Sequence, residues 1–220
     1  MKIIIFAPHP DDEIIGVGGT IAKRTSMGDD VYVCVVTKGY EPLFSAEFID
    51  RGRKECLEAD KLLGVKNTIF LDFPSSMLDT IPMYEINEKI LGIVNEIKPD
   101  EVYIPHKGDM HIDHRIVAES VMVAVRPRGD YYPKRVYAYE TLSETGWNIS
   151  SVDNEFIPTM YVDITMFLDK KLRAMQKYRS QLQDFPNTRS LKTIESLSYF
   201  RGSTVSVKSA EAFSLIREVK

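Results

Sequence analysis

The chain begins with an apolar run that ends abruptly in proline, histidine and acidic residues: Lys2-Ile3-Ile4-Ile5-Phe6-Ala7-Pro8-His9-Pro10-Asp11-Asp12-Glu13. Such a run of β-branched and aromatic residues predicts a buried strand, and the change to polar residues predicts where the chain leaves the sheet. In open α/β sheets, functional groups collect at the carboxyl ends of the strands. The segment therefore predicts a first strand and part of a functional site.

Outward from this segment, short apolar runs alternate with longer helical patterns. Strands are predicted at 2–7, 31–37, 67–72, 101–105 and 135–140, and helices at 14–27, 46–64, 83–98 and 112–126. This alternation is typical of βαβ units with right-handed crossovers. We predict an α/β fold, a Rossmann-like three-layer α/β/α sandwich with a mostly parallel sheet. Loops 38–48, 73–82 and 127–133 are expected to form the rim of a pocket.

The last third of the chain predicts a strand at 159–163, helices at about 165–179 and 189–201, and a terminal segment at 210–219. We find no linker, repeat or low-complexity tract, so residues 1–220 are expected to form a single domain. Cys34 and Cys56 lie in apolar patterns and are predicted to be buried thiols, not part of a disulfide framework.

Composition narrows the class of protein. The chain has 220 residues, 44% of them hydrophobic, and a formal net charge of −4, so it has no general positive charge for binding nucleic acid. No apolar run approaches the ~20 residues that span a bilayer. Met1 leads directly into the first strand. We therefore expect a cytoplasmic protein without a membrane span.

A second polar cluster follows the strand predicted at 101–105: Pro105-His106-Lys107-Gly108-Asp109-Met110-His111-Ile112-Asp113-His114-Arg115. All four histidines of the chain lie in these two segments. Because the carboxyl ends of parallel strands point to the same edge of a sheet, the two segments are expected to meet. We interpret them as two halves of one metal site.

Catalytic zinc is held by three nitrogen or oxygen ligands and keeps a fourth position open for water. His9 and Asp12 from the first segment and His114 from the second satisfy this requirement. Asp11 would then point toward the water. His111 is left free to act on the substrate, and Asp113 is near enough to orient its ring and favour its protonated form.

Structural alternatives exist for each cluster taken alone. Acids before a helix are common N-terminal caps, which interact well with the helix dipole. A single histidine at a strand end, such as His106, is more often a hydrogen-bonded structural residue than a ligand. The coincidence of two strand ends, both rich in His and Asp, favours the metal site.

These two motifs resemble those of the LmbE-like, or PIG-L, zinc-dependent deacetylases, which remove the acetyl group from N-acetylglucosamine-containing molecules. Weaker similarities extend over the whole chain: Arg53-Lys54-Glu55, Leu62-Leu63-Gly64, Tyr139-Glu140-Thr141, Lys171 with Ser180-Gln181, and Ala210-Glu211-Ala212-Phe213. The resemblance implies Zn²⁺ as the cofactor, with Fe²⁺ as an alternative for this ligand set. It also implies a small amino-sugar conjugate as substrate, and many members form homo-oligomers.

The resemblance also implies roles for individual residues. Asp11 is the general base, and His111, held by Asp113, stabilises the oxyanion. Arg53 is expected to bind substrate, the alternative being an exposed helix arginine paired with nearby acids. Apart from the resemblance, Asp109 is expected to contact substrate or to partner a histidine, with a loop-capping acid as an equal alternative.

Two other functions remain open at this stage. Gly16-Val17-Gly18-Gly19 follows the first strand, as in Rossmann nucleotide-binding proteins. These glycines fall inside the predicted helix, however, and do not form GxGxxG directly after the strand. We interpret them as close helix packing. The second alternative is a non-catalytic, metal-dependent carbohydrate-binding protein, which needs the ligands but no base.

Overall fold

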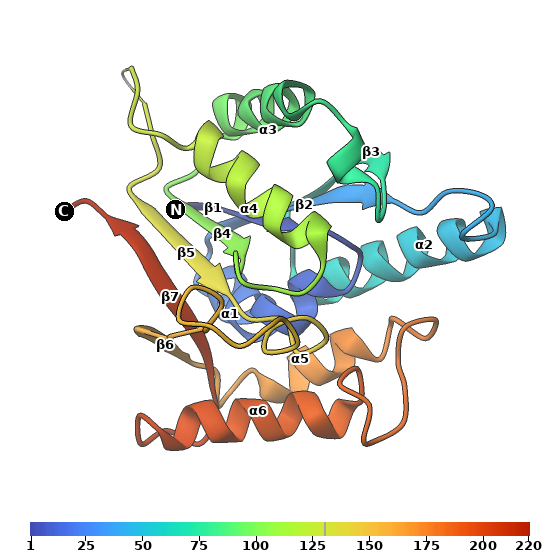
Figure 1. The fold of residues 1–220 in the computed structure, drawn as a ribbon. Coiled ribbons are helices and arrows are strands. Elements are labelled where there is room, and N and C mark those ends of the chain that lie inside the picture. Colours follow the sequence, from blue (N-terminus) through green and yellow to red (C-terminus); the bar gives the residue numbers. More distant parts are fainter. Residues whose placement is uncertain (130) are drawn as a thin grey trace.

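The computed structural model contains a central sheet with helices on both faces (Figure 1). It describes residues 1–129 and 131–220, so residue 130 of the predicted rim loop 127–133 lies outside the described residues. The elements are β1 (Lys2–Ala7), α1 (Asp12–Ser26), β2 (Asp30–Lys38), α2 (Ala46–Leu63), β3 (Asn67–Pro74), the 3₁₀ turn η1 (Leu78–Thr80), α3 (Met83–Ile97), β4 (Glu101–Pro105), α4 (Ile112–Ala124), β5 (Arg135–Tyr139), β6 (Met160–Asp163), α5 (Leu168–Met175), α6 (Leu191–Ser203) and β7 (Ala210–Glu218).

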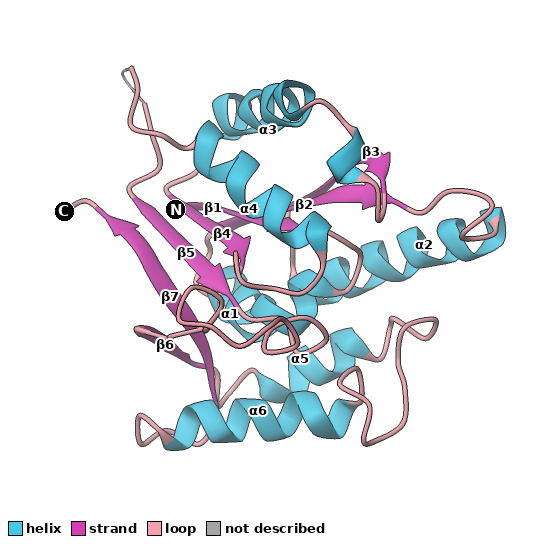
Figure 2. Ribbon diagram, in the orientation of Figure 1, coloured by secondary structure: helices cyan, strands magenta, loops and turns pink. Residues whose placement is uncertain are grey.

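The sheet has seven strands in the order β3-β2-β1-β4-β5-β7-β6. The five strands from β3 to β5 are parallel, whereas β7 runs antiparallel to β5 and to β6 at the edge of the sheet (Figure 2). This confirms the mostly parallel sheet. β1 lies between β2 and β4, where the strand order reverses. Open α/β sheets bind ligands at such a reversal, outside the carboxyl ends of the strands.

Two hydrophobic cores flank the sheet, one on each face. Side chains of β1 alternate between them: Ile3 and Ile5 pack with residues of α1, α2, α5 and α6, and Ile4 and Phe6 pack with residues of α3 and α4. Alternation along a strand follows from its two-residue period. The arrangement confirms the three-layer α/β/α sandwich.

The glycines of α1 allow close packing between layers. A Cβ on Gly16 would overlap the ring of Tyr139 in β5, and a Cβ on Gly19 would lie 2.7 Å from Ile164 Cδ1. Both glycines lie inside α1, after its first turn. The prediction of close helix packing is therefore correct, and these glycines form no phosphate-binding loop.

A buried ion pair joins the C-terminal elements to α1. Lys171 Nζ of α5 lies 2.6 Å from Glu211 Oε1 of β7. The Glu211 carboxylate also accepts hydrogen bonds from the backbone N–H groups of Gly19 and Thr20, at 2.8 and 2.7 Å, and Lys171 donates to the Ile15 carbonyl at 2.8 Å. These three hydrogen bonds attach the ion pair to the middle of α1, the helix that begins at the acidic turn.

The two cysteines are buried and free, as the sequence predicted. Among the described residues, none of the helices has the length and apolar character needed to cross a bilayer.

We expect Glu211→Gln to lower the free energy of unfolding by about 3–5 kcal/mol, because it leaves the buried Lys171 ammonium without a counter-charge. Denaturant titration followed by circular dichroism measures this. The matched control is Asp169→Asn, which removes an exposed partner of Arg173 on the same helix α5. Exposed pairs contribute little. Equal losses in the two variants would contradict a structural role for the buried pair.

The buried carboxyl group of Asp60 in α2 is expected to make the stability of the fold depend on pH. Its carboxylate is buried and accepts a hydrogen bond from Thr68 Oγ1 at 2.6 Å, and burial raises the pKa of Asp60 from 3.8 to about 7. The folded state therefore holds this proton more tightly than the unfolded chain does. We expect stability to fall as pH rises from about 4 to about 7, and Asp60→Asn to flatten that slope in unfolding measurements across this range. An unchanged slope in the variant would contradict the assignment.

Candidate metal centre

The two polar segments meet because β1 and β4 are neighbouring parallel strands. Ile3 pairs with Glu101 and Ile5 with Tyr103, so the two strands end side by side. The chain leaves β1 through residues 8–11 into α1, and leaves β4 through residues 106–111 into α4. The histidines and acids of both turns therefore face one another across the reversal in strand order.

His9, Asp12 and His114 form a group that could hold a metal ion. One ligand atom of each lies within 4.8 Å of the others. Asp12 Oδ2 is the shared centre, 3.3 Å from His9 Nδ1 and 3.2 Å from His114 Nε2. Asp12 and His114 are fully buried at the starts of α1 and α4, and His9 is half-buried.

The bonding of these atoms fits a cation. Asp12 Oδ1 and His114 Nε2 are buried and make no hydrogen bond to any described residue. Buried polar atoms without partners are rare unless water or an ion satisfies them. Burial alone would raise the pKa of Asp12, but the His114 and His9 rings hold it well below its ordinary value. A stable carboxylate and two imidazoles form a donor set that zinc and iron(II) both accept.

Two further carboxylates orient the imidazoles. Asp109 Oδ2 lies 2.8 Å from His114 Nδ1, and Asp113 Oδ2 lies 3.0 Å from His9 Nε2. Such carboxylate–histidine pairs set the tautomer of a ligating ring and raise its basicity. Asp109 is fully buried, and its other oxygen accepts a hydrogen bond from Thr145. It therefore holds His114 and is not among the residues that line the pocket, which favours the histidine partner over the substrate contact.

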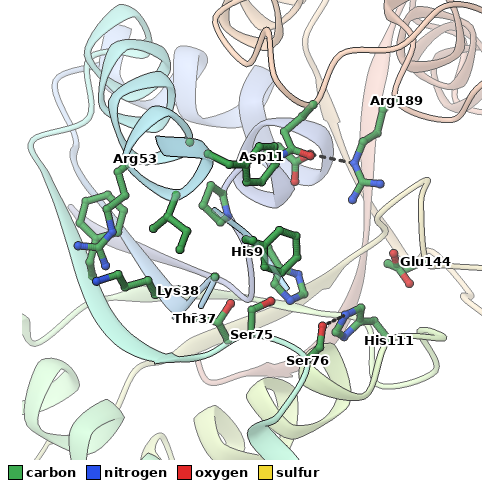
Figure 3. Close-up of a pocket in the computed structure, with 18 residues that line it drawn as sticks. His9, Asp11, Thr37, Lys38, Arg53, Ser75, Ser76, His111, Glu144 and Arg189 are labelled. Atoms are coloured by element: carbon green, nitrogen blue, oxygen red, sulfur yellow. Dashed lines mark hydrogen bonds and ion pairs between the residues drawn. The ribbon is translucent and has the colours of Figure 1, made fainter. Parts of the chain in front are cut away.

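The carboxylate of Asp113 lies closer to His9 than to His111. Its carboxylate lies on His9, and Asp113 Oδ2 is 3.8 Å from His111 Nδ1. His111 instead caps α4, its Nδ1 accepting a hydrogen bond from the Asp113 backbone N–H at 3.1 Å. Burial and the nearby His9 ring lower the pKa of His111 to about 4, and the opposing effect of Asp113, which raises this pKa, is smaller. The Nε2 atom points toward Ser76 Oγ, 3.5 Å away (Figure 3).

Asp11, which precedes α1, has an unusual backbone conformation. Its φ of 105° lies in the left-handed region, which is uncommon for any residue other than glycine. Strain of this kind persists where the surroundings hold it, often at functional sites. Asp11 Oδ2 accepts a hydrogen bond from Arg189 Nε at 2.9 Å, while Oδ1 is buried without a partner among the described residues. Burial raises the pKa of Asp11 to about 6, although Arg189 opposes this shift.

A pocket of about 250 Å³ opens beside this group. His9, Asp11 and His111 line it, with His111 near Arg189 and Glu144 on one side of the view and Arg53 with Lys38 on the other (Figure 3). The predicted rim loops 38–48 and 73–82 contribute lining residues, whereas no described residue of 127–133 does. His106 lies outside the pocket, where its Nε2 is 3.1 Å from the Asn154 carbonyl.

Arg189 and Glu144 are pocket residues that the sequence did not reveal. Arg189 comes from the loop before α6, and Glu144 from the turn after β5. Neither lies in a recognisable motif. Glu144 follows closely on Tyr139-Glu140-Thr141, which carried part of the family resemblance, so this proximity was the one available signal.

Comparison with known proteins agrees with this geometry. The chain belongs to the PIG-L family, whose profile, described as GlcNAc-PI de-N-acetylase, matches residues 4–125. It is 28% identical to the diacetylchitobiose deacetylase of Thermococcus kodakarensis, over 83% of this chain and 71% of that protein. It is 30% identical to an uncharacterized deacetylase of Escherichia coli, over 81% of this chain and 90% of that protein.

Among solved structures, the N,N'-diacetylchitobiose deacetylase from Pyrococcus horikoshii aligns with a TM-score of 0.80 at 28% identity, covering 98% of this chain and 84% of that one. The matched family segment includes both strand ends, so the resemblance drawn from the two motifs is confirmed.

We expect Asp109→Asn to weaken Zn²⁺ binding about 10- to 100-fold, because the neutral amide no longer raises the basicity of His114. Competition with a chromogenic chelator measures this affinity. Asp169→Asn, at an exposed acid far from the pocket, is the control. Unchanged affinity in Asp109→Asn would show that Asp109 does not support a metal ligand.

Proposed function

We propose that this protein is a zinc-dependent hydrolase that removes the N-acetyl group from an N-acetylglucosamine-containing small molecule. His9, Asp12 and His114 would hold the metal, with Fe²⁺ as the alternative ion. The observation that carries the proposal is the placement of the Asp11 carboxylate, buried but with Oδ1 unpartnered, in a pocket next to this group. A cytoplasmic location and a single functional unit over residues 1–220 belong to the same proposal.

Zinc bound at this site would supply Lewis acidity, which makes water more acidic and an acetamide carbonyl more electrophilic. Asp11 is the residue placed to take the proton from the attacking water. Its Oδ1 is free to accept, while Arg189 holds Oδ2. The same carboxyl can then return the proton to the leaving amine of the sugar.

His111 is placed to stabilise charge on the acetyl oxygen. Because its Nδ1 accepts the Asp113 N–H, the ring proton of the neutral imidazole is on Nε2. That nitrogen faces the pocket beside Ser76. A neutral imidazole can therefore donate a hydrogen bond to the developing oxyanion, and no protonated form is required.

Arg189 has a positioning role in this proposal. Its guanidinium binds one oxygen of the Asp11 carboxylate, whose backbone has a positive φ, and leaves the other oxygen available. A carbohydrate-binding protein without turnover would need the three metal-binding residues but not this arrangement. The geometry therefore favours the enzyme over the non-catalytic alternative.

Acetate release from a panel of N-acetylglucosamine conjugates, with zinc supplied, tests the proposal. We expect Asp11→Asn to lower turnover about 10²- to 10⁴-fold while zinc remains bound, because only the base is lost. His111→Ala should lower turnover about 10²- to 10³-fold, also with zinc retained. His114→Ala should lose the metal itself.

The control for this experiment is Asp169→Asn, which should behave like the unaltered protein. Conjugates that bind to the zinc-loaded protein without release of acetate would support the binding protein instead. Full activity of Asp11→Asn would remove Asp11 from the mechanism.

A further inference from the structure

Apolar side chains form one wall of the pocket, away from His111. We call this the aromatic wall and define it as Phe44, Phe48, Ile49 and Phe70, all of which line the pocket and are half-buried. The Phe44 and Phe48 rings stack at a centroid distance of 5.6 Å and an interplanar angle of 15°. Aromatic surface left open beside a catalytic group is available to a ligand.

Local sequence explains how the wall is built. Phe48, Ile49, Gly52 and Arg53 are spaced so that they share one face of α2. Gly52 lines the pocket, and a Cβ at this position would meet no atom within 4 Å. The absence of a side chain at Gly52 therefore keeps space open within the pocket.

Gly39, just beyond β2, packs closely against two residues of the wall. A Cβ at Gly39 would lie 3.0 Å from the Phe44 ring and 3.1 Å from Ile49 Cγ1. A larger residue would have to displace these side chains. The two glycines thus shape the same subsite, one by close contact and one by leaving space.

One of the two cations beside the wall is compensated. Arg53 pairs with Asp72, and its guanidinium lies over the Phe70 ring at 4.6 Å from the centroid. Asp72 has a φ of 62° at an irregularity in the β2–β3 pairing. Lys38 is exposed and also lines the pocket, and it borders a neighbouring hollow that Asp50 and Asp72 line. The wall itself carries only apolar side chains, so it suits a neutral apolar group.

We infer that the aromatic wall is a subsite for a neutral aryl group that the substrate carries on the anomeric carbon of the amino sugar, next to the carbon that bears the acetamide. This inference rests on the proposed function, because it takes the acetamide to lie between Asp11 and His111. The pocket is continuous from these residues to the wall. An aryl group there would cover open Phe surface and gain stacking contacts.

A matched pair of substrates, phenyl and methyl N-acetylglucosaminide, isolates this contact, since the two differ only in the aglycone. Both anomers are assayed with the zinc-loaded protein by release of free amine. We expect kcat/KM for the phenyl glycoside to exceed that for the methyl glycoside about 10-fold or more. The ratio is the readout, because it cancels effects on the shared chemistry.

Two variants test the wall by opposite routes. Phe48→Ala removes stacking surface, and Gly52→Leu fills the open space with a residue that favours helix more than glycine does. Both should bring the phenyl-to-methyl ratio toward one. Phe200→Ala, at an exposed ring on α6, is the control and should keep the ratio of the unaltered protein.

Each outcome separates this inference from the proposed function. Hydrolysis of both glycosides at equal kcat/KM would overturn the subsite while leaving the deacetylase intact, as would a preference that survives both variants. Absence of hydrolysis would count against the proposed function. The subsite is then judged by calorimetry with phenyl and methyl glucosaminide: tighter binding of the phenyl compound, lost in both variants, supports it, and equal binding overturns it.

Discussion

The contact of the Asp12 carboxylate with His9 and His114 is the interaction on which the rest of the site depends. It exists because β1 and β4 are parallel neighbours, so that two turns a hundred residues apart end at one edge of the sheet. Burial of a carboxylate with two imidazoles is costly unless the charges are matched. The donor set, its burial and its unpartnered atoms are consistent with a site that a divalent cation completes.

The surrounding carboxylates differ in the groups that they contact. Asp109 and Asp113 each hold one imidazole through its second nitrogen, whereas the Asp11 carboxylate is held by Arg189. Chemically identical groups thus acquire different roles from their hydrogen bonds and burial. His111 accepts the Asp113 backbone N–H at Nδ1 and presents Nε2 to the pocket.

The pocket combines a polar end, where the proposed chemistry takes place, with an apolar end formed by the aromatic wall. Phe44 and Phe48 lie in and beside a loop that connects β2 to α2, a kind of segment that varies easily without disturbing the sheet. The residues of the proposed reaction therefore lie at the ends of β1 and β4. The residues of the proposed selectivity lie mainly in the β2–α2 loop and on one face of α2.

By itself, the sequence determined the parallel α/β core, the two strand-end motifs and the family, because hydrophobic periodicity and the spacing of His and Asp are local properties of the chain. It could not determine which acid holds which histidine, since the choice between His9 and His111 for Asp113 depends on side-chain directions across two helices. Arg189, Glu144 and the pairing of Arg53 with Asp72 were equally hidden. These contacts depend on the tertiary structure, because the longest of them, Asp113 with His9 and Arg189 with Asp11, join segments more than a hundred residues apart.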